Sequence, residues 1–89
     1  MDKLAKSLAG HDKDRIYAVV KEEEGYVFLA DGKRRTLDSP KKKKLRHVQL
    51  ILHMPDECGS ALASAVRDSD VIHVLKLYHQ ALRGPEEHK

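Results

Sequence analysis

The sequence predicts a small α+β protein, with short β-strands in the first part of the chain and helices in the second. Runs of β-branched and aromatic residues alternate with turn clusters up to about residue 52. After Pro55 the apolar residues recur with the spacing of an amphipathic helix. A length of 89 residues allows one small domain, or a small domain with a helical appendage.

Five segments are predicted as strands because each combines strand-favouring residues with a turn signal at its border. They are Lys3–Leu8, Arg15–Lys21, Tyr26–Ala30, Lys33–Leu37 and Leu45–Leu52. Asp31 and Gly32 form the strongest two-residue hairpin signal, and should fold Lys33–Leu37 back onto Tyr26–Ala30. Several short strands at this spacing are typical of a small barrel or sandwich.

Two helices are predicted in the second part, Asp56–Arg67 and Val71–Leu82, with N-caps for the latter offered by residues 68–70. One face of the second helix carries an apolar stripe, which consists of Val71, Val74, Leu75, Tyr78 and Leu82. We interpret this stripe as core, packed on the strands or on the first helix. A partner-binding helix is the alternative.

Positive charge is concentrated in the first part of the chain. The net charge is +3 and the isoelectric point is about 9.1. Residues 1–53 hold 13 Lys and Arg against 8 Asp and Glu, whereas residues 54–89 hold 4 against 6. This asymmetry indicates a polyanionic partner. The run Lys41–Lys44 is its strongest signal, although a solvated charge run, a nuclear-localisation signal or a membrane-surface segment would look the same.

Other functional classes lack the residues that they need. Cys58, the single cysteine, is interpreted as a small apolar filler, and the six histidines do not have familiar metal-ligand spacing. There is no catalytic constellation and no phosphate-cradling glycine loop, so we expect no enzyme activity, no cofactor and no small-molecule substrate. The aromatic content of 4% argues against recognition of single strands by base stacking. Met1–Arg15 lacks the apolar stretch of a secretory signal, and no apolar run approaches a membrane span, so a cytoplasmic protein without membrane contact is expected.

The stretch LAGHDKDRIYAVV, residues 8–20, resembles a KOW motif, which places a turn glycine and basic residues between two strands. The resemblance continues through residues 29–35 and 40–49, and covers roughly residues 3–50. The ordering looks like that of the small bacterial KOW-domain RNA-binding proteins, which are similar to the large-subunit ribosomal KOW proteins of archaea and eukaryotes (the fourteen-e group). Asp14 stands where the motif has a second glycine, and His11 where it often has a basic residue. Asp tolerates the left-handed backbone region, so the turn can survive.

The resemblance implies an SH3-like KOW barrel of about five strands at residues 1–52, followed by a C-terminal helical segment at 53–89. It also implies RNA binding through the barrel loops, often on a ribosome. We therefore expect non-catalytic binding to ribosomal or other structured RNA, with the large ribosomal subunit as a possible partner. The alternative is a protein-interaction module of the SH3-like type in transcription or translation machinery.

Ten basic residues are predicted to contact RNA phosphates. The first-rank residues are Lys33, Arg34, Arg35, Lys41, Lys42, Lys43, Lys44 and Arg46, and the second-rank residues from the KOW turn are Lys13 and Arg15. Since adjacent side chains of an extended segment point to opposite faces, not all four lysines of the run can contact one RNA strand.

Overall fold

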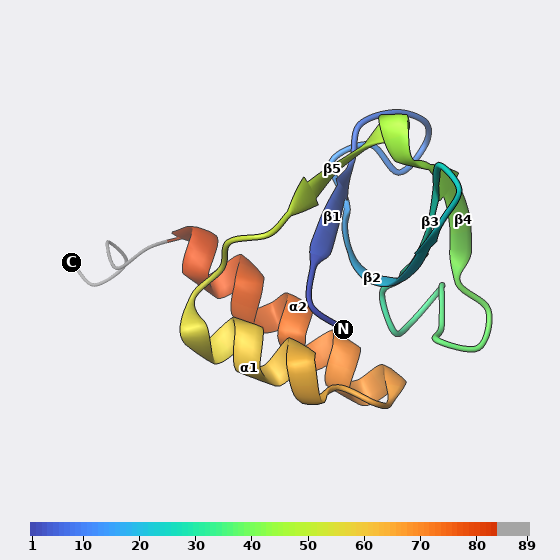
Figure 1. Ribbon diagram of the computed structural model, residues 1–89. Coiled ribbons are helices and arrows are strands. Elements are labelled where there is room, and N and C mark those ends of the chain that lie inside the picture. The colour runs from blue at the N-terminus through green and yellow to red at the C-terminus, as the bar shows by residue number, and fades with distance from the viewer. Residues whose placement is uncertain (84–89) are drawn as a thin grey trace.

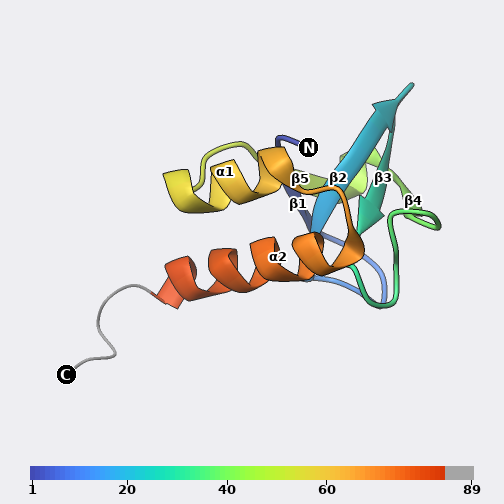
Figure 2. The same ribbon diagram turned by 90° about the horizontal axis from the view of Figure 1, so that it is seen from below.

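A computed structural model describes residues 1–83 as a five-stranded antiparallel sheet with two α-helices (Figure 1), so the predicted α+β class is confirmed. The elements are β1 (Leu4–Ser7), β2 (Ile16–Glu23), β3 (Tyr26–Ala30), β4 (Lys41–Lys44), the 3-10 turn η1 (Leu45–His47), β5 (Val48–Ile51), α1 (Asp56–Ser64) and α2 (Asp68–Arg83). The strand order is β4-β3-β2-β1-β5. Figures 1 and 2 show both helices at the end of the sheet away from β3 and β4. Neither helix within residues 1–83 has the length and apolar character that crossing a membrane requires.

The sheet is open, which corrects the expectation of a closed barrel. Its two edge strands, β4 and β5, are not paired with each other. Between them η1 turns the chain, so the predicted strand Leu45–Leu52 exists only in its second half. The amide of Leu45 donates to the carbonyl of Gly25, and the amide of Leu8 donates to the carbonyl of His47, both at 2.8 Å. These bonds fix η1 between the two edge strands.

Residues 31–40 form a loop, so the predicted hairpin at Asp31 and Gly32 is wrong. The Oδ1 atom of Asp31 accepts hydrogen bonds from the amides of Lys33 and Arg35, both at 2.9 Å. The amide of Asp31 in turn donates to the carbonyl of Arg35 at 2.8 Å. Such local bonds offer the backbone an alternative to a strand ladder. Strand β3 therefore pairs with β4, and not with residues 33–37.

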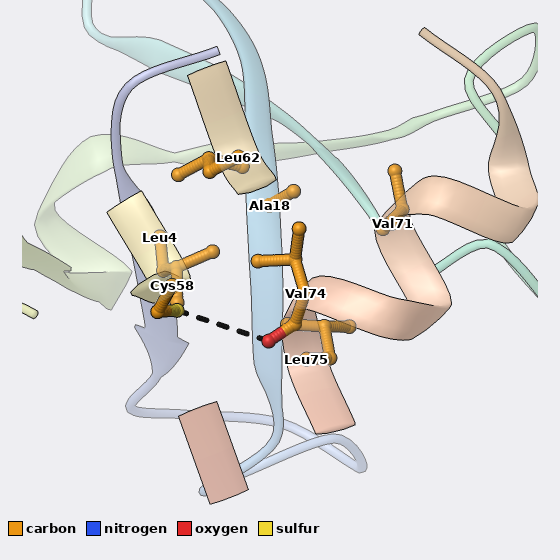
Figure 3. Close-up of a cluster of buried hydrophobic side chains, with 7 residues drawn as sticks. All are labelled: Leu4, Ala18, Cys58, Leu62, Val71, Val74 and Leu75. Atoms are coloured by element: carbon orange, nitrogen blue, oxygen red, sulfur yellow. Dashed lines mark hydrogen bonds between the residues drawn. The ribbon is translucent and has the colours of Figure 1, made fainter. Parts of the chain in front are cut away.

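Both faces of the sheet carry apolar clusters. The helix-covered cluster contains Leu4 and Ala18 from the sheet, Cys58 and Leu62 from α1, and Val71, Val74 and Leu75 from α2 (Figure 3). On the opposite, inner face, the second cluster contains Ala5, Tyr17, Val19, Val27, Leu29 and Val48. The helices are thus bound to the sheet by a shared core.

The apolar stripe of α2 is core for most of its length, as predicted. Val71, Val74 and Leu75 are buried and Tyr78 is half-buried against them, but Leu82 is 63% exposed, so its assignment to the core is wrong. Cys58 is the apolar filler that the sequence predicts, because its Sγ atom lies 3.8 Å from the carbonyl oxygen of Val74 in this cluster (Figure 3). Burial raises the pKa of its thiol, which keeps the thiol protonated.

Both predicted helices exist, with corrections to the end of the first and the start of the second. Helix α1 ends at Ser64 and not at Arg67. Helix α2 begins at Asp68 and not at Val71, so residues 68–70 form its first turn and are not the N-cap that the sequence predicts. The carboxylate of Asp70 in this turn accepts hydrogen bonds from the amides of Val66 and Arg67, both at 2.9 Å, which stabilises the start of α2. Residues 65–67 therefore connect the helices.

Gly32 holds the loop of residues 31–40 against the first turn of α2. It has a φ of +83°, and a Cβ atom there would lie 2.5 Å from the carbonyl oxygen of Asp68 and 2.8 Å from Cγ1 of Ile72. The amide of Leu37 also donates to the Asp68 carboxylate at 2.8 Å. The loop is thus attached to α2 as well as to itself.

We expect Gly32→Ala to lower the free energy of unfolding by about 2–3 kcal/mol, since the substitution adds a backbone clash to the cost of a positive φ. Gly25→Ala is the matched control, because Gly25 has a φ of +87° and a Cβ atom added there would meet no other atom within 4 Å. It should lose only about 1 kcal/mol. Chemical denaturation measures both, and equal losses would contradict the packing of this loop on α2.

Candidate nucleic-acid interface

Asp12 is the one buried charged side chain among residues 1–83, and it lies in the turn of residues 8–15 between β1 and β2. Its Oδ1 atom accepts hydrogen bonds from the Ser7 hydroxyl at 2.8 Å and from Lys43 Nζ at 3.1 Å. Its Oδ2 atom accepts from the Tyr17 hydroxyl at 2.9 Å and from Lys41 Nζ at 2.8 Å. Two ammonium groups of the lysine run are therefore bound to one carboxylate.

These contacts decide the ionisation of Asp12. Burial raises its pKa, but the hydrogen bonds from Lys41, Ser7, Lys43 and Tyr17 outweigh this, so that the pKa lies well below its ordinary value of 3.8. Burial, followed by the bond to this carboxylate, raises the pKa of Tyr17 to about 12. The carboxylate is thus ionised and the phenol protonated at neutral pH.

The lysine run forms β4, an edge strand, and its side chains alternate between two faces as predicted. Lys41 and Lys43 are partly buried and reach Asp12, and Lys43 also donates to the carbonyl of Ala9 at 3.0 Å. Lys42 and Lys44 are exposed on the outer face. Only Lys42 and Lys44 are therefore available to a ligand on the outer face.

A cleft of about 180 Å³ lies between the turn of residues 8–15 and the loop of residues 31–40. Five basic residues line this basic cleft: His11, Arg15, Arg34, Arg35 and Lys41. None of the three arginines takes part in a salt bridge within the described residues 1–83. Their guanidinium groups are exposed and available to an anion.

The two carboxylates at the basic cleft, Asp12 and Asp31, already accept hydrogen bonds from groups of the protein itself. Asp12 is bound as described above. Burial raises the pKa of Asp31, but the backbone hydrogen bonds from Arg35 and Lys33 lower it by more, so this carboxylate is also ionised. The cleft therefore combines four permanent positive charges with two carboxylates whose hydrogen bonds stabilise the turn and the loop on either side of it.

The ten predicted residues are only partly brought together. Arg15, Arg34, Arg35 and Lys41 share the basic cleft, and Lys43 is turned toward Asp12. Lys42, Lys44 and Arg46 lie toward the outer face, where Lys44 and Arg46 line a separate hollow. Lys33 lines a further hollow beside α2, and Lys13 is exposed in the turn.

The structure also places residues beside this basic surface that the charge pattern alone does not indicate. Tyr26 and Phe28 are half-buried on the outer face of β3, opposite Lys44 and Lys42 respectively. The Nζ atom of Lys42 lies 4.4 Å from the ring centre of Tyr26, and that of Lys21 lies 4.7 Å from the ring centre of Phe28. The alternation of half-buried and buried residues along Tyr26–Ala30 is the signal that could have identified this face.

No protein-family model matches the chain, and a comparison with curated proteins gives no significant match. Among residues 1–83, no three histidine, cysteine, aspartate or glutamate side chains lie close enough to hold a metal ion. The interpretation of the basic surface therefore depends on its geometry and on the residues that resemble a KOW motif.

We expect Asp12→Asn to lower the free energy of unfolding by about 2–4 kcal/mol at pH 7. The substitution replaces a charged carboxylate, which accepts hydrogen bonds from two partly buried ammonium groups, with a neutral amide that has one acceptor oxygen. Asp14→Asn is the matched control, since Asp14 has a φ of 74°, which Asn tolerates, and its carboxylate is 67% exposed. It should change stability by less than about 0.5 kcal/mol.

The pH dependence follows from the lowered pKa of Asp12. A depressed pKa in the folded state stabilises the fold above the unfolded-state pKa of about 3.9, and this stabilisation is lost as the pH falls below that value. The wild-type protein should therefore lose more stability than Asp12→Asn between pH 5 and pH 2. Denaturant titrations at several pH values measure this, and parallel curves would contradict the assignment.

Proposed function

We propose that the protein is a non-catalytic RNA-binding protein whose basic cleft contacts the phosphates of a structured RNA, such as a ribosomal RNA. The observation that carries this proposal is the convergence of Arg15, Arg34 and Arg35 on one cleft, without salt-bridge partners among residues 1–83. Guanidinium groups bind phosphate oxygens through paired hydrogen bonds. Cytoplasmic localisation and association with the large ribosomal subunit belong to the same proposal.

The loop that carries Arg34 and Arg35 is well suited to this role because it is ordered in advance. Asp31 closes it from within, and Gly32 packs it on α2. A preorganised loop loses less conformational entropy when a ligand binds. The mechanism would be neutralisation of phosphates with release of counterions, which makes affinity fall as salt rises.

The proposed relationship to KOW domains has support in the turn of residues 8–15. Gly10 and Asp14 both have positive φ values, 88° and 74°. Asp14 thus occupies the backbone region that a glycine would occupy in the motif. An SH3-like fold is part of the same proposal, supported by the antiparallel order in which β5 returns beside β1.

An experiment must distinguish binding to RNA from binding to a protein partner. In-cell crosslinking followed by pulldown of the tagged protein should recover a defined RNA segment. Recovery of a protein partner, with RNA at background, would contradict the proposal and favour an interaction module.

Arg34→Gln/Arg35→Gln should weaken binding to the recovered RNA by about 10-fold or more at moderate salt, because each arginine lost removes a phosphate contact. The slope of the logarithm of affinity against the logarithm of salt concentration should become shallower by about 1–2. Fluorescence anisotropy titrations over a range of salt concentrations measure both quantities.

The matched control is Arg67→Gln/Arg83→Gln, which removes the same charge from exposed positions on the helical side. It should change affinity by less than about 2-fold. Equal effects of the two double variants would mean that net charge, and not the basic cleft, determines binding.

A further inference from the structure

The outer face of β3 and β4 has a composition that phosphate binding does not explain. Tyr26 and Phe28 project from β3 on the side opposite the buried residues Val27 and Leu29. Around them are the exposed side chains of Lys42 and Lys44. Two of the four aromatic residues of the chain therefore lie side by side, with Lys42 and Lys44 of β4 on one side and Lys21 and Glu23 of β2 on the other.

The helices leave this part of the sheet uncovered. They pack over the Ala18 region of β2, and Figures 1 and 2 show β3 and β4 at the other end of the molecule. A hollow beside Tyr26 is lined by Gly25, Lys44, Leu45 and Arg46. The Tyr26 ring thus has an accessible neighbouring space with cations at its border.

We propose that this aromatic face binds unpaired RNA bases, with Tyr26 and Phe28 as stacking platforms and Lys42, Lys44 and Arg46 as phosphate contacts. This inference rests on the proposed RNA binding, but it does not depend on the basic cleft. Base stacking on aromatic rings combined with nearby cations is the general mode by which proteins bind single strands. The low aromatic content, which argued against stacking, is compensated by the placement of both rings on one face.

The spacing of the two rings selects the form of the ligand. Residues two apart on a strand are separated by about 6.8 Å. Successive nucleotides of one strand in a duplex are only about 3.4 Å apart. The aromatic face therefore fits bases that are splayed apart, as in a loop or bulge, and not a stacked helix.

The rings have another possible role, since lysines already lie over them. The Nζ atoms of Lys42 and Lys21 contact the rings of Tyr26 and Phe28, and Lys21 also pairs with Glu23 at 3.8 Å. A purely structural role would have these lysines cover the rings permanently. In the base-binding role, the flexible ammonium groups move to the incoming phosphates and leave the rings to the bases.

The test compares two polyanions, single-stranded oligouridine and inorganic polyphosphate of similar charge, of which only the first carries bases. Tyr26→Leu/Phe28→Leu should weaken oligouridine binding by about 10-fold and change polyphosphate binding by less than about 2-fold. Lys42→Gln/Lys44→Gln should weaken both. Circular dichroism shows whether the leucine variant is folded.

Tyrosine emission gives a second readout, because the protein has no tryptophan. Oligouridine should quench the emission of the wild-type protein, and Tyr26→Phe should keep the affinity while losing much of the quenching. An affinity for oligouridine that is unchanged in Tyr26→Leu/Phe28→Leu, or one that falls equally for polyphosphate, would overturn the proposal. If Arg34→Gln/Arg35→Gln alone weakens oligouridine binding, the aromatic face is excluded and the basic cleft stands, whereas failure of the wild-type protein to bind any RNA overturns both.

Discussion

The buried carboxylate of Asp12 is the interaction on which the arrangement of the basic surface depends. It receives hydrogen bonds from β1, from β2 and from the edge strand β4, which join segments far apart in the chain. Four adjacent lysines are a poor sequence for a strand, because their charges repel and Lys is depleted in sheets. Two ammonium groups neutralised by one carboxylate, together with pairing to β3, explain why this run is nevertheless extended.

The same interaction separates the functions of alternate lysines. Lys41 and Lys43 point inward to Asp12 and stabilise the wall of the basic cleft, while Lys42 and Lys44 border Tyr26 and Phe28 on the outer face. A charged edge strand also discourages pairing with other chains, so the run protects the edge of the sheet. In the proposed function, an RNA strand that crosses this edge binds both surfaces, with phosphates in the cleft and unpaired bases on the aromatic face.

Local patterns in the sequence predicted the α+β class, three of the strands, both helices and most of the α2 stripe, because each depends on the spacing of near neighbours. The strand at 33–37 failed, since the Asp31 side chain closes a turn of its own and Gly32 fits against α2, a partner that a hairpin signal does not contain. The site was predicted only as a set of charges. The two lysine partners of Asp12 are 29 and 31 residues away from it, and the cleft joins residues 11–17 to residues 31–41, so neither could be predicted before the fold was known.

The division of the lysine run is tested most directly by measuring stability and RNA affinity for Lys41→Gln/Lys43→Gln and Lys42→Gln/Lys44→Gln, which remove the same charge from opposite faces of β4. The first should lower the free energy of unfolding by about 2–4 kcal/mol. The second should leave the free energy of unfolding within about 0.5 kcal/mol. It should weaken RNA binding and make the dependence of affinity on salt shallower, because two phosphate contacts are lost. Equal losses of stability in the two variants would contradict the account, because Lys41 and Lys43 would then contribute no more to stability than the exposed Lys42 and Lys44.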